Sequence, residues 1–482
     1  MGANKERSHS GLVRTLGKRV WSQDHRGFES RPLRKNMKIL RRYLVWVVFI
    51  LLSVFVAKIV ERCADSIFIS DQLELAAVLI SKHNPIALFW HILPPHRQGF
   101  MFIIWGFLQS FIGLDARISA WMAFITILCA TYVAIKVLRK ITAPSLVDFV
   151  IPLSFISLKL HETLVGVPNP SHGPAPLLLF FLLTVGLLMP SGVKKGLYLS
   201  LIIFLMAFSG FGLVILPVAA AYATILLLRI YKSGGLKAIQ GFSKTNSYPY
   251  IILAGVLLSS ALFLHGYKFY SAVDCFSGGV NITSEMIYVS LIAAHLLGYF
   301  FLNYSSLIVG LLFLLILTLI FVRSGYMILH SKNKKTDSQA IDHVFFGSGF
   351  SVVFILLTAY GRGCLGLKTA FASRYLIYLL PGIWATLIYL KSTDVWPGLK
   401  TIWKKHLLIF FAILLINVEL RVFGSWFGSV LAWHNAKQEI ARCFRGDQAQ
   451  ILGCVEKTGV AVFPNPERAA ELLQIIYKIP KR

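Results

Sequence analysis

Long apolar segments recur along this chain of 482 residues. A helix needs about 20 mostly apolar residues to cross the hydrocarbon core of a bilayer. Only 14% of the residues are charged, against about 25% in a typical soluble domain. The sequence therefore predicts an all-α polytopic membrane protein. The main apolar segments are 43–60, 118–138, 177–189, 211–228, 250–264, 305–322, 344–360, 375–390 and 407–418.

The formal net charge is +27, from 48 Lys and Arg against 21 Asp and Glu. Most of these cations stand in short loops between apolar segments, which is the bias of loops that stay in the cytoplasm. The basic stretches lack the interleaved aromatic side chains of a nucleic-acid surface, so a nucleic-acid partner is not indicated. The basic loops contain Arg139 and Lys140, Lys194 and Lys195, residues 229–244, residues 323–335, and Lys404 and Lys405.

The first 36 residues differ from the rest, because they show little apolar periodicity. Their string HRGFESRPLR looks like the conceptual translation of a tRNA gene's T-arm, so we expect translation to start at Met37. The alternative is a genuine basic arm, and no cleavable signal is indicated. We therefore expect three parts: an N-terminal extension (1–36), a transmembrane domain (37–424) and an extracytoplasmic tail (425–482).

The positive-inside bias predicts about eleven spans, with the N-terminus in the cytoplasm and the C-terminus outside. Two apolar segments do not fit this alternation as spans. Residues 98–113 are short and glycine-punctuated, and a span at 286–303 would move the basic 323–335 loop outside. We expect both to be interfacial helices in outer loops. The expected spans are 43–60, 118–138, 144–160, 177–189, two spans that turn at Ser209-Gly210, 250–266, 305–323, 344–360, 375–390 and 406–423.

The outer loops of this topology collect the unusual polar residues. The loop before 375–390 holds Arg362, Lys368 and Arg374 on the side that should carry few cations. Such a cluster indicates binding of an anion such as a lipid phosphate, which Arg can hold with two oxygens at once. The alternative is that these cations only reach toward lipid headgroups. Other outer-loop residues are Asp65, Asp71, Glu74, His96, Arg97, His161, Glu162 and His172.

Asp71 and Glu74 stand one helical turn apart, directly after the first expected span. An outer carboxylate beside a lipid-phosphate site can act as the base of a glycosyl transfer, taking the proton of the acceptor hydroxyl. The alternative is that Asp71 caps the following helix and Glu74 is a solvated surface residue.

Six cysteines show no metal-ligand spacing. Cys129 lies inside an expected span and is a small apolar residue there. Cys443 and Cys454 stand in the polar tail, where an extracytoplasmic location would favour a disulfide. Two free thiols are the alternative.

Four short motifs occur in the order found in bacterial members of the GT-C superfamily, the polytopic membrane glycosyltransferases that use polyprenyl-phosphate sugars. The chain resembles that superfamily over roughly residues 40–480. Its motifs depart from the family pattern, because Pro95 replaces an acid, the second-loop motif lacks a Trp, and Asp71 is followed by Gln72 rather than a second acid. A lone Asp is a weak Mg²⁺ or Mn²⁺ site, so the cofactor is left open. The motifs are Asp71, Pro95-His96-Arg97, His161-Glu162-Thr163-Leu164 and Ser373-Arg374-Tyr375.

The resemblance implies roles for individual residues. Asp71 would be the catalytic base, and Glu162 is the next candidate. The other residues would hold the donor phosphate or the acceptor: His96, Arg97, Arg362, Lys368, Arg374 and Tyr375.

We therefore expect an inverting glycosyltransferase of the bacterial inner membrane. It would move a sugar from a polyprenyl-phosphate donor to a cell-surface glycan or lipid on the extracytoplasmic side. A polysaccharide polymerase or ligase is one alternative, although its Arg and His would gather in one large late outer loop. A flippase or transporter for a lipid-linked sugar is another. It should carry charges within its spans, where this sequence shows little besides Asp148 and Glu419.

Overall fold

The computed structural model describes most of the chain from Arg31 onward and is almost entirely helical. Cys454 lies outside the described residues, so the Cys443–Cys454 disulfide stays a prediction, as does the extension 1–36. The described residues are 31–82, 85–93, 96–240, 247–267, 282–298, 302–330, 335–363, 366–392, 401–443, 468, 471, 472, 475 and 476.

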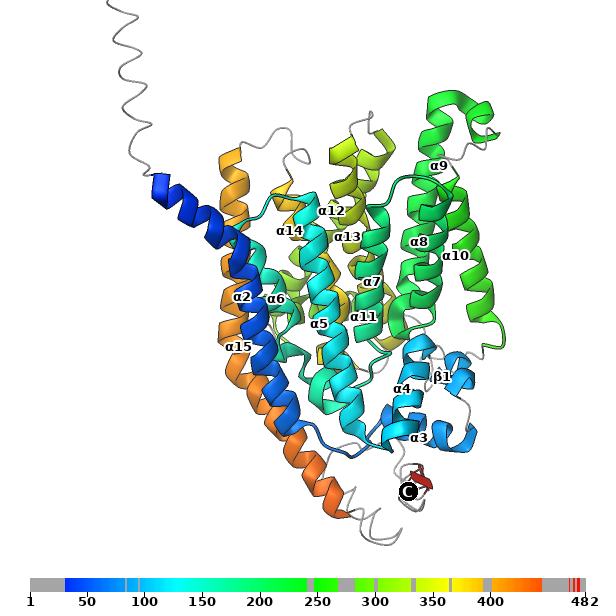
Figure 1. Ribbon diagram of the computed structural model, residues 1–482, viewed down its shortest axis with the longest axis vertical. Helices are drawn as coiled ribbons and strands as arrows, with labels where there is room; N and C mark the ends of the chain where they lie inside the picture. The colour runs from blue at the N-terminus through cyan, green and yellow to red at the C-terminus, as the bar shows by residue number, and fades with distance from the viewer. Residues whose placement is uncertain are drawn as a thin grey trace, which may run out of the picture.

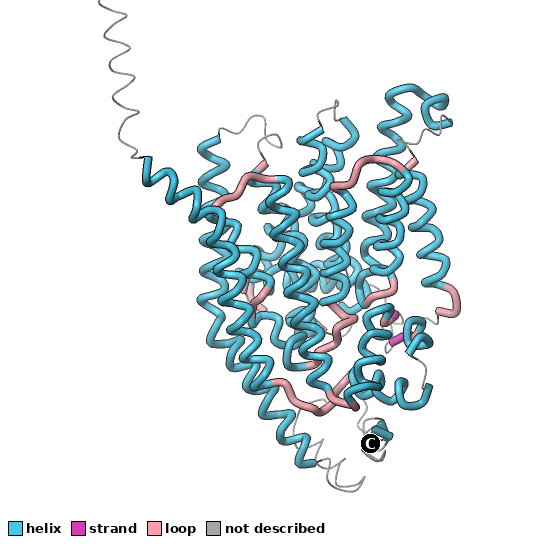
Figure 2. Tube along the Cα trace, viewed as in Figure 1, coloured by secondary structure: helices cyan, strands magenta, loops and turns pink. Residues whose placement is uncertain are grey.

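The helices form a bundle, and a small hairpin of β1 (Ile92–Leu93) and β2 (His96–Arg97) stands at one end of it (Figures 1 and 2). The α-helices are α2 (Arg31–Cys63), α3 (Asp71–Lys82), α4 (Gly99–Ile112), α5 (Ala116–Ile141), α6 (Val150–Phe155), α7 (Pro174–Leu187), α8 (Val193–Ala207), α9 (Ile215–Gln240), α10 (Tyr248–Leu264), α11 (Ile282–Leu296), α12 (Tyr304–His330), α13 (Lys335–Arg362), α14 (Leu380–Lys391) and α15 (Thr401–Cys443). The tighter or wider helical turns are η1 (Pro85–Trp90), η2 (Leu146–Phe149), η3 (Leu158–Leu160), η4 (Glu162–Gly166), η5 (Gly210–Val214), η7 (Leu367–Phe371) and η8 (Ser373–Leu379).

Five helices of the described chain are long and apolar enough to cross a membrane, and α15 adds a sixth if its two halves form one bent span. This confirms a multi-pass membrane architecture for the expected spans at 43–60, 118–138, 305–323 and 344–360 and for the second span after Ser209-Gly210. The five long helices cover Ile39–Cys63, Ala116–Ile141, Gly210–Gly235, Tyr304–His330 and Gln339–Arg362.

The other expected spans are short or broken, so the count of eleven stays a prediction. Residues 144–160 divide into η2, α6 and η3 rather than one helix. The helices α7 and α14 have 14 and 12 residues. At about 1.5 Å per residue, such helices are shorter than the roughly 30 Å hydrocarbon core.

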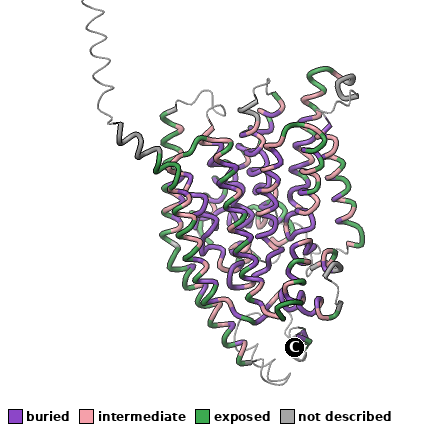
Figure 3. Tube along the Cα trace, viewed as in Figure 1, coloured by how far each residue is buried: buried purple, intermediate pink, exposed green. Residues whose placement is uncertain are grey.

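The long helices differ in how much of them the protein covers (Figure 3). The most apolar window of α13 is 78% buried, while the corresponding windows of α2 and α12 are 22% and 33% buried. On α2, Ile50, Leu51 and Val54 are each more than half exposed. Large apolar side chains on the outside of a helix bundle suit contact with lipid tails. We conclude that α13 is central and that α2 and α12 form lipid-facing edges.

The segment expected as an outer interfacial helix at 286–303 forms α11, and the second half of this helix is buried in the protein. Every described residue from Tyr288 to Gly298 is buried. A Cβ at Gly310 of α12 would lie 1.8 Å from the carbonyl oxygen of Ser290, so only glycine allows this helix contact. Small residues that let two helices approach closely are typical of packing within membrane domains. This half of α11 therefore packs inside the protein, and the interfacial position of the segment stays a prediction.

The last long helix, α15, continues through the expected boundary at residue 424. Its two halves, Ile402–Arg421 and Phe423–Arg442, are bent by 44° relative to each other. The helix runs along α2 (Figure 1), and at the start of its second half the rings of Phe423 and Phe55 are 6.0 Å apart. The start of the predicted tail is therefore a continuation of this helix rather than a separate segment.

Two ion pairs lie inside the bundle and account for the charges that the sequence places within spans. Lys391 Nζ is 2.6 Å from Asp148 Oδ1, and the exposed fractions of the two side chains are 5% and 0%. Lys159 Nζ is 2.7 Å from Glu419 Oε1, and Lys159 is completely buried. The pairing offsets the cost of burying each charge.

Candidate functional site

The candidate site lies at the end of the bundle that carries α3, α4 and β1, opposite the ends of α5, α9 and α14 that lead into basic loops (Figure 1). Four parts of the chain meet there: the start of α3, the β-hairpin, the stretch from η4 to the start of α7, and η8. The site is built from loops because these elements end at one face of the bundle.

Glu162 and Arg374 form the centre of this site. Arg374 Nη1 lies 3.1 Å from Glu162 Oε1, with 30% and 14% of the two side chains exposed. The backbone N–H of Arg374 donates to Glu162 Oε2 at 3.3 Å, and the backbone N–H of Glu162 donates to Ser373 Oγ at 3.1 Å. The two motifs that the sequence analysis took from separate outer loops are therefore in direct contact.

The Arg374 side chain stays positively charged in the folded protein. Burial is the largest single effect and lowers the pKa of its guanidinium, but Glu162, Tyr375 and Asp71 together raise it by more. The resulting pKa lies above its ordinary value, so Arg374 is a permanent cation. Asp71 is close enough to act on this charge, and the three residues form one electrostatic group.

Asp71 is the first residue of α3, and the preceding Ser70 has a positive φ of 52°. Among the described residues, no hydrogen bond or ion pair engages the Asp71 carboxylate. The neighbouring Gln72 does bond to the segment before the helix, where its Oε1 accepts from the backbone N–H of Ile69 at 3.4 Å. The capping alternative for Asp71 thus has no contact in its favour, and the carboxylate is available.

Gln72 positions the start of α3, although sequence reasoning treated it only as a departure from a paired-acid motif. Its side chain is 1% exposed, and its Nε2 donates to the carbonyl oxygen of Pro168 at 2.7 Å. This bond joins the first outer loop to the turn that follows η4. Gln72 therefore holds Asp71 near Glu162, a role that requires an amide rather than an acid.

A cluster of two histidines and aromatic rings adjoins this group. The ring centroids of His96 and His172 are 5.0 Å apart, and Phe211 lies 3.8 Å from His96 and 4.9 Å from His172. The guanidinium carbon of Arg362 is 5.6 Å from the centroid of the Phe211 ring. Sequence reasoning missed Phe211 and Tyr378, which packs on His172, because apolar residues next to a site give no separate signal.

Both histidines are neutral at ordinary pH. Burial lowers the pKa of His96 well below its usual value, and His172, Arg362 and Arg374 lower it further. Burial likewise lowers the pKa of His172, and Arg374 and Arg362 add to that effect. The pattern shows that the two arginines and the two imidazoles share one region. A neutral imidazole there can donate or accept a hydrogen bond.

Several buried polar atoms near the histidines have no hydrogen-bond partner among the described residues. They include His96 Nε2, Gln98 Nε2 and Ser171 Oγ. Asn169 Nδ2 donates to Gln98 Oε1 at 3.3 Å and connects the β-hairpin to the turn before α7. Buried polar atoms usually have partners, so these atoms are available to a polar ligand such as a sugar hydroxyl.

The remaining predicted site residues are not gathered with this group in the same way. Arg97 donates to the carbonyl oxygens of Trp90, Phe263 and His265. It therefore anchors the end of α10 to the β-hairpin. Lys368 is exposed on η7, and Tyr375 is buried next to Arg374. We expect Arg97 to stabilise the loop that carries His96 rather than contact a ligand.

Asp65 and Glu74 interact with residues near the end of the chain. Asp65 accepts from Gln438 Nε2 at 2.5 Å and lies 3.0 Å from His434 Nδ1. Burial raises the pKa of Glu74, while Arg468 lowers it and Asp71 raises it. The two Asp65 contacts attach the second half of α15 to the segment before α3, and Arg468 lies close enough to α3 to act on Glu74.

The second half of α15 also supports η4. Lys437 Nζ donates to the carbonyl oxygen of Val165 at 2.6 Å, and a Cβ at Gly166 would lie 3.0 Å from the Trp433 ring. This contact fixes the turn that begins at Glu162.

No group of three or more His, Cys, Asp or Glu side chains that could hold a metal ion occurs within the described part of the chain. A scan against protein-family models and a search of curated proteins both found no match. The function must therefore be argued from the site itself.

Proposed function

We propose that this chain is an inverting membrane glycosyltransferase, similar in layout to the GT-C superfamily. It would transfer a sugar from a polyprenyl-phosphate donor to a cell-surface glycan or lipid, on the extracytoplasmic side of a bacterial inner membrane. Its N-terminus would be cytoplasmic, its C-terminus outside, and the shorter apolar helices would complete about eleven spans. The proposal is carried by one observation: the Asp71 carboxylate has no hydrogen bond or ion pair among the described residues and lies close enough to Arg374 of the Glu162–Arg374 pair to act on its charge.

Each residue of this group has a place in such a reaction. The acceptor hydroxyl oxygen forms a bond to the anomeric carbon of the sugar, and the bond from that carbon to the phosphate oxygen breaks. Asp71 accepts the hydroxyl proton, and the phosphate leaves with the electron pair. Arg374 and Arg362 stabilise the negative charge of the departing phosphate. Glu162 is occupied by Arg374, so we assign it to orienting that cation rather than to proton transfer.

One observation favours the transporter alternative. The buried pairs Lys159–Glu419 and Asp148–Lys391 are charges inside the helical domain, as in many transporters. Each charge already has its partner, however, and a pair closed in this way is also what stability alone requires. We therefore keep glycosyl transfer as the principal function.

The decisive experiment compares two variants of the same helix. Proteoliposomes containing wild type, Asp71→Asn or Glu74→Gln receive a polyprenyl-phosphate sugar with a labelled sugar, and transfer to an added membrane-glycan fraction is measured. Loss of a general base slows a reaction by about 10²-fold to 10⁴-fold. Asp71→Asn should show such a loss, and Glu74→Gln, which makes the same change of charge, should keep its rate.

Two outcomes would contradict the proposal. If Asp71→Asn transfers sugar as fast as wild type, Asp71 is not the base. If labelled donor crosses the bilayer without any transfer to acceptor, the chain is a transporter. Mass spectrometry of surface glycans from a deletion strain complemented with the same variants provides the test in cells.

A further inference from the structure

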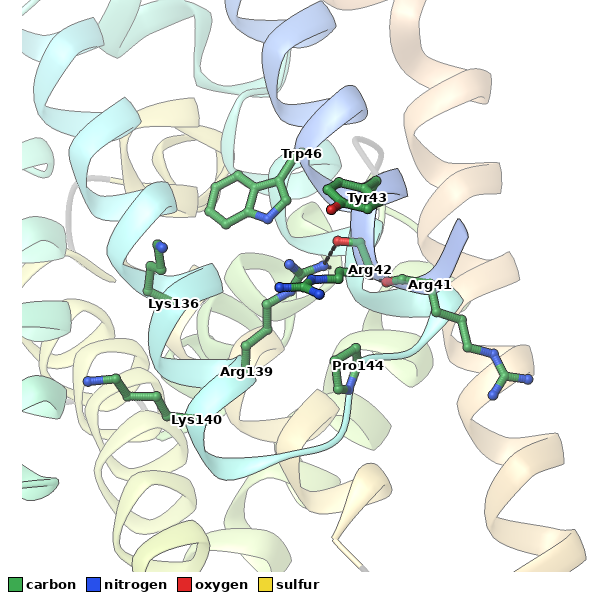
Figure 4. A pocket seen from close by; sticks show the side chains of 8 residues that line it. All are labelled: Arg41, Arg42, Tyr43, Trp46, Lys136, Arg139, Lys140 and Pro144. Atoms are coloured by element: carbon green, nitrogen blue, oxygen red, sulfur yellow. Dashed lines mark hydrogen bonds between the residues drawn. The ribbon is translucent and has the colours of Figure 1, made fainter. Parts of the chain in front are cut away.

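A strongly basic pocket lies at the opposite end of the bundle from the candidate site. It has a volume of about 750 Å³ and is formed between the start of the apolar part of α2 and the end of α5 (Figure 4). Arg139 and Lys140 stand at the end of α5, and Arg41 and Arg42 stand next to the apolar part of α2. Five cations line the pocket: Arg41, Arg42, Lys136, Arg139 and Lys140.

These cations have no acidic partner in the pocket, because Asp and Glu are absent from the residues described as its lining. Asp148 acts on Arg139 from nearby, but its carboxylate is already paired with Lys391. Arg139 Nη2 donates to the backbone carbonyl of Arg42 at 2.5 Å, which fixes the guanidinium at the pocket wall. A second donor, Arg139 Nε, is buried without a partner among the described residues. The pocket therefore has an unbalanced positive charge and is suited to an anion.

The pocket also contains an aromatic wall at the level expected for lipid headgroups. Lys136 Nζ lies 5.7 Å and the Arg139 guanidinium carbon 5.4 Å from the centroid of the Trp46 ring. Trp46 in turn packs on Tyr132 with ring centroids 5.5 Å apart. Trp and Tyr are enriched where the membrane meets water, with cations next to them on the cytoplasmic side.

Exposed apolar side chains continue from the pocket along both helices. Val47 and Leu51 of α2 are 50% and 64% exposed, and Ile125 of α5 is 53% exposed. A soluble anion would gain nothing from this surface, whereas the acyl chains of a lipid would cover it. The cationic pocket suits the anionic head of an amphiphile, and the apolar helix faces suit its acyl chains.

We infer that this pocket binds the phosphate headgroup of an anionic phospholipid from the leaflet on the basic-loop side. Arg42, Lys136 and Arg139 contact the phosphate, and its acyl chains lie along α2 and α5. The site is distinct from the candidate glycosyl-transfer site at the other end, and it stands whether or not that function is correct.

The test measures lipid binding by the full-length protein. Detergent-solubilised wild type and an Arg42→Gln/Lys136→Gln double variant are titrated with phosphatidylglycerol and with phosphatidylcholine, and bound lipid is counted by native mass spectrometry. A Lys194→Gln/Lys232→Gln variant is the matched control, because both lysines are exposed at the basic end but do not line the pocket. All four side chains are exposed, so folding should be unaffected; a melting curve of each variant checks this.

Wild type and the control should bind phosphatidylglycerol more tightly than phosphatidylcholine. The pocket variant should bind phosphatidylglycerol about thirtyfold more weakly, the factor expected for two cations near an anionic headgroup. Equal affinity of the pocket variant and the control would overturn the proposal. Displacement of phosphatidylglycerol by a few millimolar inorganic phosphate would overturn it as well, because the pocket would then be a site for free anions.

Discussion

Both ends of this molecule gather cations and aromatic rings, but the central cation has an acidic partner at one end and the cations have none in the pocket lining at the other. At the candidate site, Arg374 is paired with Glu162 and largely enclosed. At the basic pocket, Arg42 and Lys136 are exposed and have no acidic partner in the lining. A partner fixes a cation in one orientation, which positioning for a reaction requires, whereas an unpaired exposed cation keeps its attraction for an external anion.

The largest effect should come from breaking the pair of Lys159 and Glu419, whose cation is completely buried. Lys159→Met leaves the Glu419 carboxylate without its cation, and we expect it to lower the free energy of unfolding by about 3–5 kcal/mol. The measurement is thermal or detergent-induced unfolding of the purified protein. The double variant Lys159→Met/Glu419→Leu removes both charges and should recover most of the loss. If Lys159→Met is as stable as wild type, the Glu419 carboxylate does not depend on the cation of Lys159.

The Glu162–Arg374 pair should give a smaller effect, because it is partly exposed. A double-mutant cycle with Glu162→Gln, Arg374→Gln and the combined variant should give a coupling free energy of about 1.5–3 kcal/mol, typical of a hydrogen bond between charged groups. Unfolding free energies provide the cycle. Additive single effects would mean that the two side chains act independently and that Glu162 does not orient Arg374.

Acid should weaken the candidate site and leave the basic pocket unaffected. The pKa values of His96 and His172 are lowered in the folded protein, so the unfolded chain binds more protons below its own pKa of about 6.5. Stability is therefore complete above that pH and falls by about 1.4 kcal/mol per pH unit and per imidazole below it. Melting temperatures at pH 7.5, 6.5 and 5.5 measure this slope.

His172→Gln should reduce the acid-dependent loss, since one of the two buried imidazoles is gone. If the variant loses stability with the same slope as wild type, His172 is not excluded from protonation in the folded state.

Salt should produce the smallest effect, and only at the exposed end. Raising NaCl from about 0.1 M to about 1 M shortens the screening length from about 10 Å to about 3 Å. We expect phosphatidylglycerol binding at the basic pocket to weaken by roughly fivefold, because its cations face solvent. The coupling between Glu162 and Arg374 should change much less, since Arg374 Nη1 and Glu162 Oε1 are 3.1 Å apart and both side chains are mostly buried. If lipid binding at the basic pocket and the Glu162–Arg374 coupling respond equally to salt, the cations of the two ends do not differ in their exposure to solvent.

The sequence was most informative about features that residue type and position along the chain predict without knowledge of the fold. Apolar runs predicted the long helices α2, α5, α12 and α13, because only such runs suit a lipid environment. The outer-loop polarity predicted Asp71, Glu162 and Arg374 as candidates, and these three lie together.

It was least informative where a role depends on a partner far along the chain. Gln72 looked like a missing acid, yet it anchors α3 to Pro168. Arg97 looked like a phosphate ligand, yet it donates to the end of α10. The burial of Tyr288 to Gly298 was also not foreseen, because the hydropathy of a segment does not reveal which helices cover it.

The sequence by itself determined the membrane class, the positions of the longest helices and the end at which unusual polar residues collect. These follow from composition and spacing, since burying apolar side chains depends little on which partner covers them. The tertiary structure alone decided which charges are paired: Lys159 with Glu419, Arg374 with Glu162, and the pocket cations with no described acid. The reason is that charge pairing needs atoms within a few ångströms, and only the folded chain brings residues more than 200 positions apart to that distance.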